Sequence, residues 1–306
     1  MLDGRADRVT LRLRRVAARL LHKGAGPDEL RMFGLDSIAG LNRTDLENAC
    51  RTLVSPAYLG QNIGLCRILG RYKLYVDTRD TTHAPHLLLD GYWESWITQF
   101  IARRVLAGWT VFDVGACYGY YSMLLADLIG PRGHLTTIEP NPATSQLLRI
   151  SINLNGFAER TTICTAAAGS SGSEFSTLAV PLTSPGHATM QRAPTCTAGS
   201  IAVQVPSVTL DSLVKPGQHV DFLKIDAEGS EQRIIAGMSA IIETHRPDIL
   251  LEFDRSNYSE PAAFLTYLNE LYGSLAHIEP SGMAVPISSQ AVLDQPGVWM
   301  LFLSQS

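Results

Sequence analysis

The sequence predicts an α/β fold: a doubly wound, mostly parallel sheet with one antiparallel edge strand. Three observations indicate it. From about residue 109 onward, short apolar runs of strand length alternate with helical patterns. Each run is apolar throughout, as expected for a strand buried on both faces of a sheet. The first run leads through a glycine-containing turn into a helical pattern, in VFDVGACYGYYSMLLAD over residues 111–127.

Apolar runs and the patterns between them locate the elements. We expect strands over residues 110–114, 134–139, 161–166, 221–226 and 249–253. We expect helices to start at Gly119, Pro142, Glu231 and Pro261. The C-terminal residues 274–278 and 298–303 supply two further strands, one of them antiparallel at an edge. Before the sheet, residues 71–76 predict an accessory strand and residues 93–106 a helix.

Residues 1–70 look helical and irregular, so we expect a helical N-terminal extension that makes substrate or oligomer contacts, followed by one domain over residues 71–306. Over residues 7–23, apolar and arginine positions separate onto different faces of a basic amphipathic helix. We expect this helix to pack on the body of the protein or on a second subunit, as in a homodimer; a membrane-surface helix is the alternative. The Ser/Thr/Pro/Gly-rich residues 183–200 predict a long loop or flap.

The composition disfavours several classes of partner and of binding site. The 25 basic and 29 acidic residues give a formal charge of -4, which does not favour a polyanion, so no nucleic acid partner is expected. The five cysteines are odd in number and lack close pairs, which argues against a disulfide framework or a zinc knuckle. No apolar run approaches the roughly 18 residues of a membrane span. We therefore expect a soluble, cytoplasmic protein without a transmembrane segment.

The turn after the first strand lies where doubly wound sheets bind ligands, outside the carboxyl ends of the strands. Gly115 allows a sharp turn, and Gly119 lets the next helix start close to a ligand. Asp113 is expected to face this crevice, where an acid favours a cation over a phosphate. An NAD-dependent oxidoreductase is disfavoured, because the loop reads D-x-G-x-x-x-G and lacks the G-x-G-x-x-G fingerprint.

Glu139 ends the next predicted strand, in TTIEPN. There its carboxylate can accept hydrogen bonds from two vicinal ribose hydroxyls. An acid for an ammonium, an acid for a ribose and no phosphate cradle together describe S-adenosylmethionine. The competing interpretation, in which Asp113 and Glu139 only cap helices or pair with arginines, is less favoured because both end apolar strands.

A second motif, VDFLKIDAEGSEQRIIAG, covers residues 220–237 and follows VPSVTLDSLV. Together with GYWESW, FDVGACYGYYS and TIEPNP, it resembles the FkbM family of S-adenosylmethionine-dependent methyltransferases, over about residues 72–253. The resemblance implies a class I methyltransferase (Rossmann-like) fold and O-methylation. It implies cofactor contacts at Asp113, Gly115, Gly119 and Glu139, and a signature beside the reaction centre at Lys224, Asp226, Glu228 and Gly229.

The glycine loop departs from the family pattern, which usually reads G-A-N-x-G. Here Cys117 and Tyr118 replace the asparagine and the residue after it, so one cofactor hydrogen bond is expected to be missing or rerouted. We nevertheless expect both residues to contact the cofactor. Further cofactor contacts are expected from Glu94, Ala167 and Glu228.

Methyl transfer to a hydroxyl needs close positioning of the acceptor, and a base within hydrogen-bond reach is useful. Asp226, at the end of its strand, is the first candidate for this base. Lys224 lies on the same strand face and can keep the carboxylate ionised, although pairing for stability alone is an open alternative. Glu228 either begins a charged helical turn or contacts substrate or cofactor.

Other groups are weaker candidates. His83, His86 and His187 have a suitable pKa for a base, but isolated histidines are more often ordinary surface or packing residues. Mg²⁺ could bind where Asp226 and Glu228 approach the end of the next strand, at Glu252 and Asp254, but a metal is not favoured. The aromatic residues Tyr92 and Trp93 line a pocket or belong to the core.

These observations predict an S-adenosylmethionine-dependent O-methyltransferase that acts on a hydroxyl of a small natural product or of a sugar or glycan. The alternative is a non-catalytic S-adenosylmethionine-binding or scaffold protein, in which the altered glycine loop reflects lost turnover. Neither the fold nor the cofactor motif identifies the acceptor, because enzymes with unrelated substrates share both.

Overall fold

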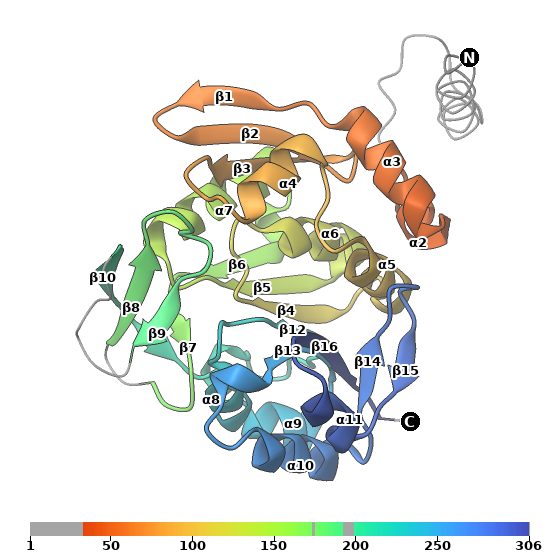
Figure 1. The fold of residues 1–306 in the computed structure, drawn as a ribbon, viewed down its shortest axis with the longest axis vertical. Coiled ribbons are helices and arrows are strands. Elements are labelled where there is room, and N and C mark those ends of the chain that lie inside the picture. The colour runs from red at the N-terminus through yellow and green to blue at the C-terminus, as the bar shows by residue number, and fades with distance from the viewer. Residues whose placement is uncertain (1–32, 173–174, 192–198, 306) are drawn as a thin grey trace.

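The computed structural model describes residues 33–172, 175–191 and 199–305; the predicted basic helix of residues 7–23 lies outside them. Its centre is an eight-stranded sheet in the order β15-β14-β16-β13-β12-β4-β5-β6 (Figure 1). The five parallel strands are β4 (Thr110–Val114), β5 (His134–Ile138), β6 (Thr161–Cys164), β12 (Phe222–Ile225) and β13 (Asp248–Asp254). The α/β class and all five predicted parallel strands are confirmed, with ends that differ by at most two residues.

The antiparallel part of the sheet is larger than predicted. β16 (Val298–Leu303) pairs antiparallel with β13 and with β14 (Ala276–Ile278), so it lies inside the sheet and not at its edge. The edge strand is β15 (Ala284–Pro286), which pairs with β14. The prediction of a single antiparallel edge strand was wrong in this detail, because a three-residue strand is too short to show a period.

Helices cover both faces of the sheet and create two hydrophobic cores (Figure 1). On one face lie α5 (Ser95–Arg104), α6 (Tyr120–Leu128) and α7 (Pro142–Leu154). On the other lie α8 (Glu231–Ala236), α9 (Ser239–His245), α10 (Pro261–Tyr272) and α11 (Ser289–Asp294). Successive side chains of β4 alternate between the two cores, since Val111 packs in the first and Phe112 in the second. Short 3-10 turns cover Gly130–Arg132, Ala158–Arg160, Asp211–Leu213 and Arg255–Asn257.

The N-terminal part adds a small sheet to the first face. The expected helices are present as α2 (Leu35–Gly40) and α3 (Arg43–Leu53), but β1 (Ala57–Gly60) and β2 (Ile63–Ile68) were missed. Both strands form an antiparallel sheet with β3 (Tyr72–Asp77), followed by α4 (His83–Leu89). This sheet crosses residue 70, so the division into an extension and a domain at that point stays a prediction.

Bonds to Asp127 of α6 fix the small sheet to the body of the protein. Arg71 Nε lies 2.5 Å and Tyr72 Oη 2.9 Å from Asp127 Oδ2. The carboxylate therefore joins residues more than fifty positions apart in the chain. None of the helices in the described ranges is long and apolar enough to cross a membrane.

The loop or flap predicted at residues 183–200 belongs to a three-stranded sheet that extends beyond it on both sides. β8 (Ser176–Pro181) pairs antiparallel with β9 (Thr189–Gln191) and β10 (Ser200–Val205), and we call residues 176–205 the flap. It is inserted between β7 (Ala167–Ala168) and β11 (Ser207–Val208), which pair in parallel. Asn141 Nδ2 donates to the carbonyl of Pro185 at 3.0 Å, and Thr81 N to that of Thr183 at 3.0 Å, so two separate segments hold the flap against the body.

The glycine loop between β4 and α6 passes very close to the end of β12. Gly115 has φ +78°, and a Cβ at this position would lie 1.7 Å from the carbonyl oxygen of Asp226. The neighbouring bond from Asp226 N to Val114 O, 3.0 Å long, holds the two segments together. A glycine is therefore required both by the backbone conformation and by the contact.

Gly115→Ala should destabilise the protein far more than Gly130→Ala, whose added Cβ meets no heavy atom within 4 Å at φ +64°. The control bears only the cost of a left-handed alanine, about 1 to 2 kcal/mol. Overpacking against Asp226 should add about 2 kcal/mol or more to the loss at Gly115. Urea unfolding measures both free energies, and equal losses would refute the close approach.

Candidate active site

The carboxyl ends of β4, β5 and β12 form one edge at which the order of strands reverses. The chain runs from β4 to β5 and β6 on one side, and then returns to β12 and β13 on the other. Such reversal points are where open α/β sheets bind ligands. Two cavities open here, with about 630 Å³ and about 390 Å³ of empty space, open solvent at their mouths included. They share His83, Gly115, Cys117 and Asp226.

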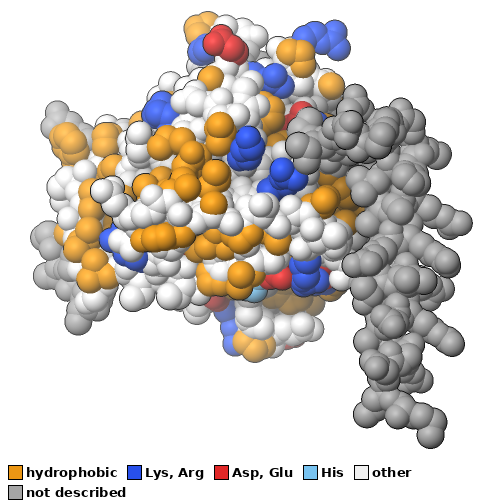
Figure 2. Space-filling model, turned by 90° about the horizontal axis from the view of Figure 1, so that it is seen from above, with side chains coloured by type: hydrophobic (Ala, Val, Ile, Leu, Met, Phe, Trp, Pro, Cys, Tyr) orange, Lys and Arg blue, Asp and Glu red, His pale blue; other side chains and the backbone are white. Residues whose placement is uncertain are grey.

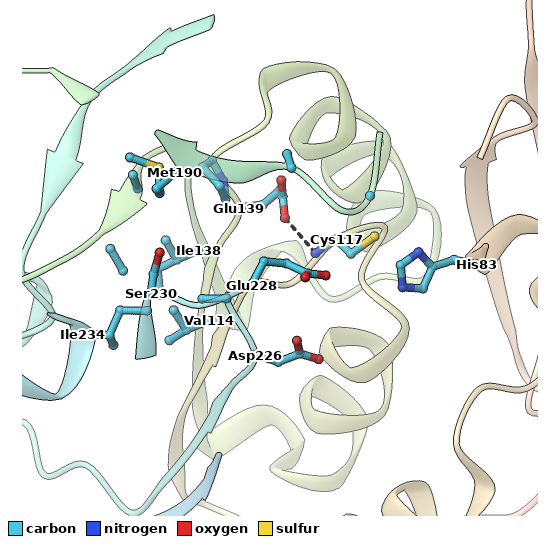
Figure 3. Close-up of a pocket in the computed structure, with 17 residues that line it drawn as sticks. His83, Val114, Cys117, Ile138, Glu139, Met190, Asp226, Glu228, Ser230 and Ile234 are labelled. Carbon is cyan, nitrogen blue, oxygen red and sulfur yellow. Dashed lines mark hydrogen bonds between the residues drawn. The ribbon is translucent and has the colours of Figure 1, made fainter. Parts of the chain in front are cut away.

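The larger cavity lies between the sheet edge and the flap (Figure 3). Ile138, Glu139 and Pro140 come from the end of β5, and Ala167 and Ala168 from β7. The segment after β12 supplies Ala227, Glu228, Ser230 and Ile234, and the flap supplies Gly186, Ala188 and Met190. The wall is thus mostly apolar with a few carboxylates, which is typical of a small-molecule site.

Glu139 is the fixed acceptor of the larger cavity. Its carboxylate accepts the backbone N–H group of Cys117 at 2.8 Å (Figure 3) and that of Asn141 at 2.8 Å. Burial raises the pKa of Glu139 to about 7, although these two N–H groups oppose the rise. A carboxylate has about four acceptor positions, so two remain for a ligand. The residue therefore suits the predicted pair of ribose hydroxyls.

In the altered glycine loop, Cys117 contacts Glu139 through its backbone. Its backbone is left-handed, with φ 50°, a conformation that asparagine and glycine adopt more readily than cysteine. The bond to Glu139 comes from its backbone N–H and does not depend on the side chain. The thiol instead lies under the flap, because a Cβ on Gly186 would be 2.9 Å from Cys117 Sγ.

Asp113 does not face the crevice as predicted. It is fully buried and belongs to the wall of neither cavity. Oδ2 accepts a 2.5 Å bond from Ser122 Oγ, in the first turn of α6, while Oδ1 has no hydrogen-bond partner among the described residues. Burial raises the pKa of Asp113, and the charge of Lys224 opposes the rise. Gly119, the left-handed residue that begins α6, also lines neither cavity.

Lys224 and Asp226 form an ion pair, as their spacing predicted, in which Lys224 is buried and Asp226 is partly exposed. Lys224 Nζ lies 2.9 Å from Asp226 Oδ2 and 4.7 Å from the centre of the Tyr121 ring. Burial by itself raises the pKa of Asp226, but the charge and hydrogen bond of Lys224 more than offset this and lower it. On β13, burial and the charge of Asp226 raise the pKa of Glu252, which favours its protonated form.

The smaller cavity has aromatic walls. They are formed by Leu87, Trp93, Ala116, Tyr118, Tyr120, Tyr121 and Lys224, besides the four shared residues. Tyr121 Oη donates to Glu94 Oε2 at 2.7 Å, so Glu94 lies behind this wall and lines neither cavity itself. Burial, followed by the charge of Asp226, raises the pKa of Glu94. Tyr118 lines the cavity as expected of a ligand contact, but its hydroxyl donates to Asp80 at 3.0 Å.

Sequence reasoning missed Asp80, which lies next to His83. His83 Nδ1 is 3.3 Å from Asp80 Oδ2, and its ring lies 4.5 Å from that of His187 in the flap. The signal was an acid three residues before a histidine at a helix start, a spacing that brings the two side chains together. His86 lines neither cavity.

Glu228 is placed at the mouth of the larger cavity. His187 Nε2 lies 3.6 Å from its Oε1. Burial, followed by the charge of Asp226, raises the pKa of Glu228 to about 7. In the part of the chain that the structure describes, no three His, Cys, Asp or Glu side chains are grouped to hold a metal ion. The carboxylate of Asp254, which was considered as a metal ligand, instead accepts hydrogen bonds from Ser256 N and Ser256 Oγ, each at 2.8 Å.

Comparison with known proteins agrees with this geometry. Residues 113–275, more than half of the chain, match the family model described as the methyltransferase FkbM domain. No curated protein matches the chain.

Similar solved structures include three methyltransferases. The FkbM methyltransferase from Methylobacillus flagellatus KT is 19% identical, with 65% of this chain and 44% of that chain covered and a TM-score of 0.41. A putative rRNA methylase from Clostridium thermocellum is 13% identical, with 68% and 92% covered and a TM-score of 0.40. An S-adenosylmethionine-dependent O-methyltransferase from Thermotoga maritima is 14% identical, with 70% and 65% covered and a TM-score of 0.40.

This chain thus spans less than half the length of the Methylobacillus protein. Because these TM-scores are low, the family assignment depends on the match to the domain model and not on the similar solved structures. That match covers the glycine loop, Glu139 and the Lys224–Asp226 pair, and the prediction of the family is confirmed. The chain belongs to the FkbM family of S-adenosylmethionine-dependent methyltransferases.

Proposed function

We propose that this enzyme transfers the methyl group of S-adenosylmethionine to a hydroxyl of a small natural product or of a sugar. The observation that carries the proposal is the acidic environment at the junction of the two cavities. Asp226 is an ionised carboxylate there, and its charge, after burial, raises the pKa of each of Glu94, Glu228 and Glu252. Among the described wall residues, Lys224 is the only lysine or arginine.

The cofactor suits the two cavities together. In the proposal Glu139 accepts the ribose hydroxyls, Ile138 and Ala167 flank the adenine, and the glycine loop from Gly115 to Cys117 supports the centre of the molecule. The amino acid end extends into the smaller cavity, toward Tyr121 and the carboxylate of Glu94 behind it. When bound, S-adenosylmethionine supplies an electrophilic methyl group on a cationic sulfur. A volume of about 630 Å³ for the larger cavity is within the range of small-molecule sites.

Asp226 acts in this proposal as a fixed negative charge for the sulfonium. Lys224 Nζ already bonds its carboxylate at 2.9 Å and lowers its pKa, which makes it a weak base. Lys224 positions Asp226 and keeps it ionised despite burial. The role first expected of Asp226, proton removal, is therefore less favoured than electrostatic binding.

The same acidic environment favours a hydroxyl over an amine as the acceptor. Nearby carboxylates raise the pKa of a bound amine and keep it protonated, so its nitrogen lacks a lone pair for attack. A neutral hydroxyl keeps its lone pairs in the same environment. Anionic acceptors such as phosphates are disfavoured because the cavities offer them one lysine, and that lysine is already paired.

Methyl release over matched acceptor pairs tests the reaction. Benzyl alcohol is compared with benzylamine, and a methyl glucoside with the corresponding glucosamine, with S-adenosylhomocysteine formation as the readout. We expect turnover of the hydroxyl member of each pair and little or none of the amine-specific product. Faster methylation of the amines would contradict the proposal.

Glu139→Gln should weaken binding of S-adenosylmethionine by roughly 10- to 100-fold, since a charged acceptor of two hydroxyls is lost. Because the pKa of Glu139 is raised to about 7, its carboxylate is charged above that pH and protonated below it. Wild-type affinity should therefore fall between about pH 8 and about pH 6, and the variant should show a flatter profile. Isothermal titration calorimetry measures both.

Glu159→Gln, at an exposed acid in the same half of the fold, is the matched control and should bind like the wild type. Glu228→Gln is measured in parallel, because the pKa of Glu228 is also raised to about 7. Unchanged affinity in Glu139→Gln would remove Glu139 from the cofactor site.

A further inference from the structure

His83 lies where the two cavities meet. Its side chain, 17% exposed, belongs to the walls of both. Figure 3 shows the imidazole directed from one side toward Cys117, Glu228 and Asp226. Because Nδ1 faces Asp80 at 3.3 Å, Nε2 lies on the side of the ring away from that carboxylate and is available to the cavities. The imidazole thus adjoins the region assigned above to the reacting methyl group.

Hydrogen bonds fix the carboxylate of Asp80 in a position that orients the His83 ring. Its side chain is fully buried, and Oδ1 accepts the backbone N–H groups of Thr82 at 2.9 Å and His83 at 3.0 Å. Oδ2 accepts the hydroxyl of Tyr118 at 3.0 Å and faces His83 Nδ1. Burial raises the pKa of Asp80, but the bonds from His83 and from the backbone outweigh it and lower the pKa to about 2. An ionised partner at Nδ1 favours the tautomer in which Nδ1 carries the proton and Nε2 is an acceptor.

We propose that His83 is the general base of methyl transfer and that Asp80 is its positioning residue. The inference rests on the proposed O-methylation. As the acceptor oxygen forms its bond to the methyl carbon, the sulfur–carbon bond breaks and its electron pair stays on sulfur. The hydroxyl proton passes to Nε2 of His83, and the resulting imidazolium later releases it to solvent. Atoms and charge balance without any further reactant.

The other titratable groups at the junction are less suited to take this proton. Asp226 is already paired with Lys224, and burial raises the pKa of the Cys117 thiol, which keeps it protonated. Glu228 lines only the larger cavity, and His187 lines neither. Of the described residues, His83 alone combines a place in both walls with a buried carboxylate that orients it.

Charges on every neighbouring element act on His83. Asp80 precedes it on its own segment, Glu139 lies on β5, Asp226 follows β12, and His187 comes from the flap. Glu94 and Glu228 complete the group. The carboxylates stabilise an imidazolium as it forms, and a protonated His187 would oppose it. Trp93, with its ring 4.9 Å from that of His83, covers another side of the imidazole.

Histidine nitrogen NMR on the full chain, loaded with S-adenosylhomocysteine, tests the geometry without any acceptor. At about pH 8.5, where an ordinary imidazole is neutral, the His83 signals should report a proton on Nδ1. Asp80→Asn should abolish this preference, while His86→Gln, at an exposed histidine of the same helix, should leave it intact. A proton on Nε2 in the wild type, or no change in Asp80→Asn, would overturn the inference.

Calorimetry of the same samples separates the two proposals. If the wild type does not bind S-adenosylhomocysteine, the proposed cofactor site is contradicted, whichever tautomer His83 adopts. Normal binding with the wrong tautomer contradicts only the role of His83. Binding of S-adenosylhomocysteine and a cooperative thermal transition in His83→Gln show that the variant is folded.

Phenol and para-nitrophenol then probe the base itself. His83→Gln should slow methylation of phenol by about 10²- to 10⁴-fold. Methylation of para-nitrophenol, which ionises without help near neutral pH, should slow much less in His83→Gln. His86→Gln should methylate both phenols at the wild-type rate. Equal losses on both phenols in His83→Gln would contradict a base. If neither phenol is methylated by the wild type, the NMR result decides.

Discussion

One buried cation allows several carboxylates to share the functional edge of the sheet. Lys224 is 2% exposed, contacts Asp226 directly and faces Asp113 and Glu94 through the same low-dielectric region. Their charges together raise the pKa of Lys224 above its ordinary value, although burial opposes this. Without the lysine, the acids would repel one another and take up protons. Glu252 illustrates that alternative, since burial and the charge of Asp226 raise its pKa.

The backbone brings this charged cluster to the ligand. Gly115 lets the loop after β4 touch the carbonyl of Asp226, which places the loop and the end of β12 on one wall. From the other side the flap closes on the same point, because Gly186 leaves no room for a Cβ beside Asp80, Cys117 and His83. Two glycines from distant parts of the chain therefore set the width of the junction. A site so enclosed strengthens electrostatic interactions with a cationic cofactor.

Local patterns were enough to predict the elements that the site depends on. The five parallel strands are continuous apolar runs, and Glu139 and Asp226 could be located because each follows such a run. Local patterns do not predict which side chains at the strand ends are buried by another part of the chain. Asp113 also lies near a strand end, yet Ser122, nine residues later, closes over it.

The junction itself could not be derived from spacing. Asp80, Tyr118, His187 and Asp226 come from four separate segments, and only tertiary packing brings them together. Two strands of the small sheet were missed for another reason: β1 is largely exposed, and Gly64 and Arg67 interrupt the apolar run of β2, so neither gives a strong signal. In the flap, β9 lies inside the Ser/Thr/Pro/Gly-rich residues 183–200, whose composition indicates a loop, and β8 and most of β10 lie on either side of it.

A crystal structure with S-adenosylhomocysteine bound tests the central claim most directly. The account predicts the ribose hydroxyls on the carboxylate of Glu139, the sulfur beside Asp226 and the glycine loop, and His83 Nε2 facing the space next to that sulfur. A nucleoside bound away from Glu139, or a sulfur remote from Asp226, would contradict it.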